Sequence, residues 1–132
     1  MEPIRTHRQA DPRWVGRVTS QGVGTARAAL DTRPEMAVDD QGLVHGSFVF
    51  GVMDLAAMVA VNHPYVVLGA TSMRLLAPVR AGARVEAEAT GGAGEGRKRE
   101  VQVTARVDGR EVATGIFTCF VLERHVLAPS DG

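Results

Sequence analysis

Residues 44–62, with the sequence VHGSFVFGVMDLAAMVAVN, form an apolar segment that contains one charged residue, Asp54. A helix that is hydrophobic on every side is one that other structure surrounds. We therefore expect a buried central helix between Phe48 and Val61, stopped by Asn62-His63-Pro64 because proline disfavours helical geometry in the residue before it. The segment is too short for the ~20 apolar residues that cross a bilayer, so it indicates a core helix and no membrane association.

Asp54 is the residue of this segment that needs an explanation, since burying an unpaired carboxylate costs several kcal/mol. It is either neutralised, by Arg74 or by backbone N–H groups, or kept for chemistry. The helix begins at His45-Gly46-Ser47, where Ser or Gly suits an N-cap. Free N–H groups and the positive end of the helix dipole are then expected close to His45, as in a site that polarises a carbonyl.

Length and composition limit the classes of function. The 132 residues suit one domain, residues 1–132, with a loosely ordered arm at 1–13 and a C-terminal tail at 126–132. Fifteen basic and fifteen acidic side chains leave no net charge, so nucleic acid is not an expected partner. The single cysteine, Cys119, cannot form an internal disulfide, and no signal-peptide core occurs in the first thirty residues. We expect a cytoplasmic protein.

The rest of the chain has the signals of strands. One strand is expected within Gly22–Thr32, and four more follow the helix. Their signals are an apolar run at Tyr65–Val79, alternation at Arg84–Ala89 and Val101–Val107, and a return strand at Glu111–Leu122. Asp108-Gly109 predicts a two-residue type I′ hairpin. The order predicts an α+β fold with an antiparallel sheet.

Part of this pattern resembles a known family. Members of the hotdog superfamily of acyl-CoA thioesterases, in the phenylacetate-pathway and 4-hydroxybenzoyl-CoA thioesterase-like group, commonly carry Asn, two residues, Gly, two residues and His-Gly-Gly. An acidic residue follows eight positions after the first Gly of that pair. Gly42, His45, Gly46 and Asp54 match these positions, whereas an aspartate and a serine replace the Asn and the second Gly. The segment Ala77–Gly82 is similar to the family's Arg-Pro-x-x-x-Gly bend. The resemblance implies the hotdog fold, an antiparallel sheet wrapped around one long buried helix.

The resemblance also implies a mechanism. Gly46 and Asp54 lie about 12 Å apart along one helix at 1.5 Å per residue, so one subunit cannot bring them together. In the family, two hotdogs pair and each site takes the helix start of one subunit and the acid of the other. Asp54 would be general base or nucleophile, Gly46 N–H would hold the oxyanion, and His45 would polarise that end. The substrate is then an acyl-CoA, the protein a homodimer or a dimer of dimers, and neither metal nor further cofactor is implied.

Other residues are expected around the substrate. Asp39 and Ser47, which stand at the two substituted positions, are substrate-binding candidates. The cluster Arg97-Lys98-Arg99 either binds the phosphates of CoA or forms a solvated entry to a strand.

Two alternative functions remain open within the superfamily. Asp40 and His45 imitate the Asp-x-Asn-Pro-x-His motif of the hotdog enoyl-CoA hydratases and dehydratases, but the Asn-Pro is missing. The other alternative is a non-catalytic acyl-CoA-binding sensor. This chain has no helix-turn-helix segment, so a sensor of this kind would need a separate partner.

Overall fold

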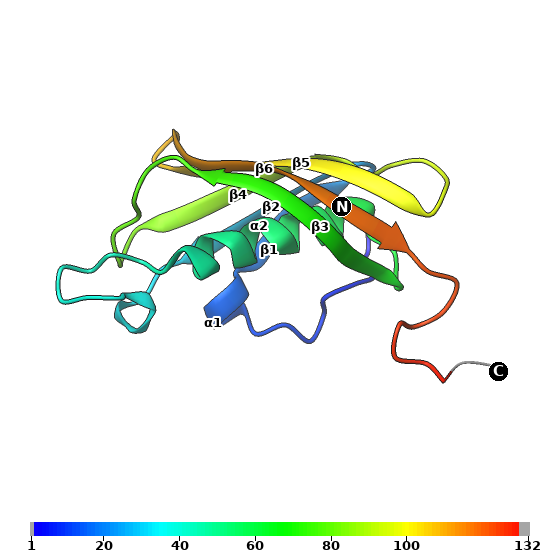
Figure 1. Cartoon of the computed structure of the whole chain (residues 1–132), viewed down its shortest axis with the longest axis horizontal. Coiled ribbons are helices and arrows are strands. Elements are labelled where there is room, and N and C mark those ends of the chain that lie inside the picture. Colours follow the sequence, from blue (N-terminus) through cyan, green and yellow to red (C-terminus); the bar gives the residue numbers. More distant parts are fainter. Residues whose placement is uncertain (1, 130–132) are drawn as a thin grey trace.

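A computed structural model describes residues 2–129 as one antiparallel sheet curved around a helix (Figure 1). The helix is α2 (Gly46–Val61), and a short α1 (Pro12–Val15) and a 3-10 turn (Pro34–Met36) precede it. The strands are β1 (Arg17–Gly22), β2 (Thr25–Asp31), β3 (Val66–Leu75), β4 (Arg84–Gly91), β5 (Lys98–Val107) and β6 (Arg110–Val121). They pair in the order β1-β2-β4-β5-β6-β3. The predicted α+β architecture and its central helix are confirmed.

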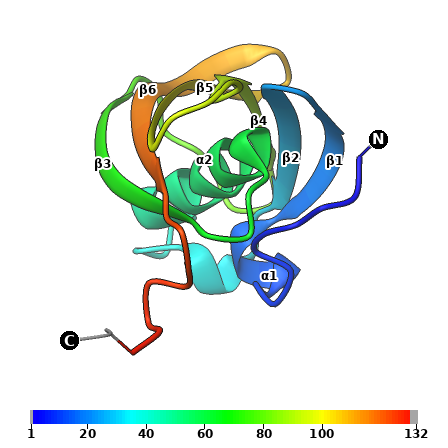
Figure 2. The same cartoon turned by 90° about the vertical axis from the view of Figure 1, so that its right-hand side faces the viewer.

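The core lies between α2 and the concave face of the sheet. Val52, Ala56 and Val59 of the helix have no exposed surface. Two of the inward positions of β4 are alanines, Ala87 and Ala89, and both are buried, so the sheet can approach the helix closely there. Viewed along the helix, the sheet encloses α2 on most sides, and the N-terminal segment and α1 lie beneath it (Figure 2). The apolar helix and the curved sheet thus bury each other's hydrophobic surfaces.

The hairpin between β5 and β6 follows the sequence prediction. Asp108 and Gly109 both have positive φ, 51° and 79°, as a type I′ turn requires. Val107 and Arg110 pair across this turn. The pairing of β5 with β6 is therefore set by a local signal of two residues.

The N-terminal part of the sheet differs from the prediction of one strand within Gly22–Thr32. It is a hairpin, in which β1 pairs with β2 across Val23-Gly24. β1 is a mostly exposed edge strand without the alternation that marks a half-buried strand. β1 forms because it pairs with β2, and the sequence of β1 alone does not predict a strand.

The N-terminal arm is attached to the far end of α2. Asn62, the C-cap of the helix, accepts a hydrogen bond from the Arg5 N–H at 2.8 Å and donates one to the Pro3 carbonyl at 2.9 Å. Of the C-terminal tail expected at 126–132, residues 130–132 lie outside the described part. Among residues 2–129, none of the helices has the length and hydropathy needed to cross a membrane.

Candidate active site

The start of α2 is capped by a histidine ring. His45 is the N-cap in an extended conformation, and its Nδ1 accepts the Ser47 N–H at 3.0 Å. The expectation that Ser or Gly would be the cap was wrong, because the imidazole reaches the same N–H that a serine oxygen would bind. Since Nδ1 accepts, the proton of the neutral ring lies on Nε2, which becomes a donor.

This cap decides which N–H groups can bind a ligand. The Ser47 N–H is bound to His45, and the Phe48 N–H donates to the His45 carbonyl at 3.0 Å. The Gly46 N–H has no acceptor inside the helix, because it belongs to the first turn. Gly46 N–H and His45 Nε2–H are therefore the donors that the helix start offers to a developing oxyanion.

The loop before the helix is held by Asp39. Its Oδ1 accepts the Gln41 N–H at 3.0 Å and the Leu43 N–H at 3.2 Å. Gly42 between them has a φ of 85°, which favours glycine. His45 N–H then donates to the Met36 carbonyl at 2.9 Å. The carboxylate of Asp39 thus positions the chain that leads into the site.

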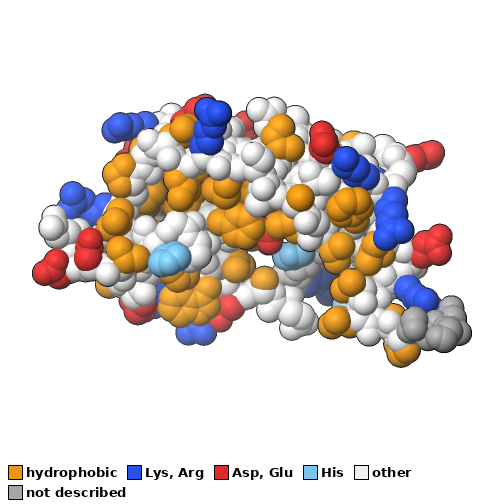
Figure 3. Space-filling view, viewed as in Figure 1, with side chains coloured by type: hydrophobic (Ala, Val, Ile, Leu, Met, Phe, Trp, Pro, Cys, Tyr) orange, Lys and Arg blue, Asp and Glu red, His pale blue; other side chains and the backbone are white. Residues whose placement is uncertain are grey.

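An apolar hollow lies beside Gly46, between the helix start and the end of β3. Leu75 and Leu76 at its rim are 59% and 50% exposed. Its lining consists of Leu43, Val44, Gly46, Val49, Leu75, Leu76, Ala77, Pro78 and Val79. A Cβ added at Gly46 would lie 2.9 Å from the tip of Leu75, so a side chain there would narrow the approach to the N–H. Figure 3 shows hydrophobic side chains along the face formed by β3 and α2.

Asp54 lies two turns further along α2, on the side that the sheet covers least. Ser47, Phe50 and Gly51 share this less buried side. The Asp54 Oδ1 is buried and has no hydrogen-bond partner among residues 2–129. In this part of the chain no ion pair with Arg74 forms, so the structural explanation for this acid is not found. Burial raises the pKa of Asp54, and the charge of His7 opposes this effect.

Cys119 of β6 is within electrostatic reach of Asp54. Burial, and then the charge of Asp54, raise the pKa of the Cys119 thiol to about 11. The thiol therefore stays protonated at neutral pH and is a poor nucleophile. Of the two residues, Asp54 is therefore the stronger candidate for a chemical role.

The predicted basic cluster is divided by the structure. Arg99 donates to the carbonyl oxygens of Gly92 and Gly96 at 2.9 and 2.8 Å and so holds the turn between β4 and β5. Lys98 is exposed. Arg97 lines a hollow at the far end of β6 together with His63, Tyr65, Gly96, Val121, Leu122, Glu123, Arg124, His125, Val126 and Ala128. Arg97 is thus the member of the cluster that stands among other basic side chains around a hollow.

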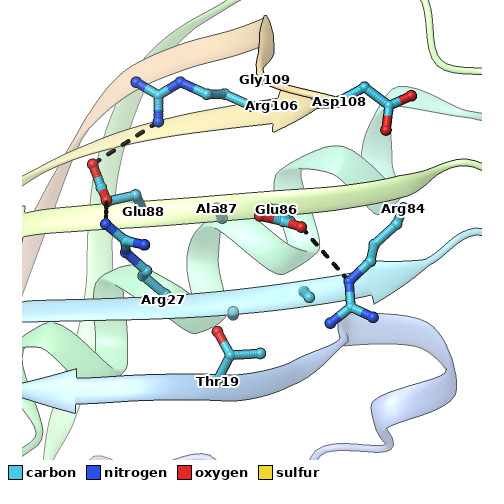
Figure 4. Close-up of a pocket in the computed structure, with 11 residues that line it drawn as sticks. Thr19, Arg27, Arg84, Glu86, Ala87, Glu88, Arg106, Asp108 and Gly109 are labelled. Atoms are coloured by element: carbon cyan, nitrogen blue, oxygen red, sulfur yellow. Dashed lines mark ion pairs between the residues drawn. The ribbon is translucent and has the colours of Figure 1, made fainter.

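A third hollow, on the outer face of the sheet, is a surface of paired charges (Figure 4). Glu88 bonds to Arg27 at 2.6 Å and lies 3.9 Å from Arg106, and Arg84 lies 3.8 Å from Glu86. The two pairs of Glu88 join neighbouring strands, whereas Arg84 and Glu86 both lie in β4, and in each pair the exposed charges neutralise one another. In the described part of the chain no three His, Cys, Asp or Glu side chains are grouped as metal ligands. The ends and the open side of α2 are therefore the better candidate site.

Comparison with solved structures places the chain in a family. It is 42% identical to the uncharacterized protein PH1136 from Pyrococcus horikoshii, over 96% of this chain and 98% of that one, with a TM-score of 0.93. It is 31% identical to a mutant of the phenylacetic acid degradation protein PaaI from Thermus thermophilus, over 82% and 95%, with a TM-score of 0.74. The chain belongs to the hotdog-fold, thioesterase-like superfamily. No family model matches the chain.

Two curated proteins contain a region similar to this chain. The methylthioribose-1-phosphate isomerase of Aquifex aeolicus is 36% identical over 91% of the chain, and this region is 26% of that protein. The transcription factor FapR of Shouchella clausii is 33% identical over 72% of the chain, which is 50% of that protein. The chain thus spans between about a quarter and a half of the length of these curated relatives.

The structure brings some predicted residues together and separates others. His45, Gly46 and Ser47 form one helix start, with Asp39 in the loop before it, whereas Asp54 lies further along the helix and Arg97 is near its other end. His7, whose charge acts on Asp54, was not expected from the sequence. No local pattern could identify it, because it lies 47 residues before Asp54 in an arm without periodicity.

We expect Asp54→Asn to stabilise the fold at neutral pH. Because the pKa of Asp54 is raised in the folded state, ionisation opposes folding above that pKa, and the penalty disappears below the pKa of the unfolded chain. The gain in Tm should therefore be largest near neutral pH and fall toward zero at about pH 4. Calorimetry across this range measures it. A lower Tm at neutral pH would mean that the carboxylate has a stabilising partner.

Proposed function

We propose that this chain hydrolyses an acyl-CoA thioester to the free acid and CoA, at a site shared between two copies. The observation that carries the proposal is the Asp54 carboxyl on the open side of an apolar helix, whose Oδ1 is buried without a hydrogen-bond partner among the described residues. An arrangement that destabilises the fold is typical of a group kept for chemistry. Membership of the thioesterase-like superfamily supports the same activity.

The donors and the acid fit the needs of thioester hydrolysis. Asp54 takes a proton from water, whose oxygen adds to the carbonyl carbon while the Gly46 N–H and His45 Nε2–H hold the developing oxyanion. The carbonyl then re-forms, the C–S bond breaks, and CoA leaves as a thiolate that takes up a proton. The same geometry serves direct attack by Asp54 on the carbonyl, followed by hydrolysis of the anhydride.

Two copies are needed because both halves of the site lie on one rigid helix. Eight residues separate Gly46 from Asp54, which is about 12 Å at 1.5 Å per residue. β3 supports pairing: it is the last strand of the described sheet, pairs there only with β6, and is exposed along most of its length. An unpaired edge of this kind, next to the exposed Leu75 and Leu76, is suited to a second copy.

The surfaces at the two ends of α2 suggest how the substrate lies. The hollow beside Gly46 is lined by apolar side chains and suits an acyl group. Arg97 and its basic neighbours suit the phosphates of CoA. We further propose a cytoplasmic location, because the one cysteine is a buried free thiol.

A non-catalytic acyl-CoA sensor is the second candidate function. It is favoured by FapR, a transcription factor half of which is similar to this chain. The two functions differ in one measurement, because a sensor binds acyl-CoA without releasing CoA. A panel of acyl-CoAs with a thiol-reactive dye, combined with calorimetric binding, decides between them.

Asp54→Asn should lower turnover by at least ~10²-fold while leaving acyl-CoA binding intact, because it removes a positioned base but keeps the shape. Steady-state kinetics and calorimetric binding on the best substrate measure both. Asp40→Asn is the matched control, an exposed acid in the loop before α2. If Asp40→Asn lost turnover of the acyl-CoA while Asp54→Asn kept it, hydratase-like chemistry would be favoured. Turnover by Asp54→Asn at the rate of the parent would show that Asp54 has no part in the mechanism.

Arg97→Ala should raise KM severalfold with little change in kcat, because a phosphate contact contributes equally to substrate and transition-state binding. KM of the parent protein should also rise with salt. Lys98→Ala is the control, since Lys98 is exposed and does not line the hollow. Equal effects of the two substitutions would indicate general charge attraction in place of a phosphate site at Arg97.

Mixing two inactive variants should restore activity if the site is shared. Asp54→Asn removes the acid. Gly46→Val places a side chain beside the Gly46 N–H and so blocks the approach to this donor, and the exposed Leu75 can move aside to make room for it. At random equal mixing about half of the dimers are mixed and each has one intact site, so recovery should approach about a quarter of the parent activity. A monomer in light scattering, or no recovery after proven subunit exchange, would contradict the shared site.

A further inference from the structure

A row of three aromatic rings leads from α1 to the start of α2. The rings of His45 and Phe48 meet edge-on, with centroids 6.4 Å apart and planes at 85°. Phe48 also contacts the ring of Trp14 in α1, with centroids 6.3 Å apart and planes at 41°. Edge-on and offset pairs at such separations are the arrangements that aromatic rings favour. Phe48 therefore links α1 to the histidine that begins α2.

Phe48 is held in place by its position in the first turn of α2. Its N–H donates to the His45 carbonyl at 3.0 Å, and residues three apart in a helical turn are neighbours on its surface. The Phe48 side chain is half-buried and packs against the hydrophobic core, whereas His45 is exposed. The exposed imidazole thus rests against a side chain that the core holds.

Trp14 is supported in turn by charged side chains from two segments. The guanidinium groups of Arg13 and Arg33 each lie 5.8 Å from the centroid of the Trp14 ring, within the range of a cation–π interaction. Arg13 is paired with Asp11 at 2.8 Å and Arg33 with Glu35 at 3.2 Å. The two arginines therefore hold the tryptophan, and their charges are already paired.

The hydrogen bond of the N-cap does not by itself fix the His45 ring. His63 and His125 make the same kind of bond, in which Nδ1 accepts the N–H two residues further on at 3.0 and 2.9 Å. The Nε2 of His45 forms no hydrogen bond to residues 2–129. A single bond at Nδ1 restrains one atom of the ring, and the contact with Phe48 restrains its plane.

We propose that Phe48 is a positioning residue for His45: supported by Trp14, it holds the plane of the imidazole so that Nε2–H stays directed at the place of the oxyanion. The role of this contact in the reaction rests on the proposed hydrolysis. A donor that is already in place stabilises the developing charge more than a mobile one, because it needs no reorientation during the reaction. Phe48 acts through His45 and does not touch the thioester.

Phe48→Leu removes the ring and keeps an apolar side chain. We expect kcat to fall about 10-fold, which is part of the roughly 10²–10³-fold loss caused by removing one oxyanion donor. KM should change little, because the donor acts on the transition state. Phe48→Tyr keeps the ring and should keep most of the activity. A raised KM at unchanged kcat in Phe48→Leu would mean that Phe48 binds the substrate and would overturn the proposal.

A double-mutant cycle tests whether Phe48 acts through His45. In a His45→Ala background, Phe48→Leu should cause little further loss of kcat, because the ring that Phe48 positions is absent. A further loss of about 10-fold in that background would mean an independent structural role and would overturn the proposal. Trp14→Leu should show the same dependence on His45 with a smaller loss, and it replaces Phe48→Leu in the cycle if that variant does not fold.

Side-chain NMR relaxation separates this proposal from the proposed hydrolysis, because it needs no substrate. The order parameter of the His45 ring C–H bonds should be near that of a rigid backbone, ~0.85, in the parent and fall below ~0.6 in Phe48→Leu. His63 and His125, which make the same Nδ1 hydrogen bond, are internal references and should not change.

Phe50→Leu is the matched control for this measurement. Phe50 is also half-buried in α2, and its ring stacks on Phe117 of β6 with centroids 5.7 Å apart. A fall in the His45 order parameter that occurs in Phe48→Leu and not in Phe50→Leu supports the proposal even if no acyl-CoA is hydrolysed. An unchanged His45 order parameter in Phe48→Leu, or an equal fall in both variants, overturns it even if the parent is an active thioesterase.

Discussion

The packing of six strands against a single helix is the constraint on which this structure depends. The inward side chains of the sheet pack mainly against α2, so the helix is apolar nearly all round. Small residues such as Ala87 and Ala105 let the strands approach it closely. Only the side that the sheet does not reach, and the two ends, remain for polar groups. His45, Asp54 and Asn62 occupy these places.

The same constraint makes the position of Asp54 costly. A carboxylate on this helix loses water and finds no hydrogen-bond donor among the described residues, so its ionisation and the stability of the fold oppose each other. A helix also fixes the separation of its residues, so Gly46 and Asp54 cannot meet within one chain. A carboxylate kept at such a cost and a donor out of its reach are both explained if a second copy completes the site.

Features encoded in a short stretch of sequence could be predicted, and those that depend on distant contacts could not. The apolar run of α2 and the Asp108-Gly109 turn are local signals. β1 depends on pairing with β2, and the role of Arg99 depends on where the Gly92 and Gly96 carbonyls lie. The spacing of Gly46 and Asp54 in the sequence was enough to identify both as candidate site residues. The effect of His7 on the pKa of Asp54 could not be found in this way, because the two residues lie far apart in the sequence.

The serine at position 47 shows how a departure from the family pattern is accommodated. With His45 as the cap, the Ser47 N–H is already bound, so a second glycine is not needed to expose that group to a ligand. The same hydrogen bond assigns the ring proton to Nε2 and thereby supplies a replacement donor. Under the proposed hydrolysis, the imidazole and the Gly46 N–H are then the two donors available to the oxyanion. The proposal therefore assigns the second donor to His45, because the Ser47 N–H is already bound.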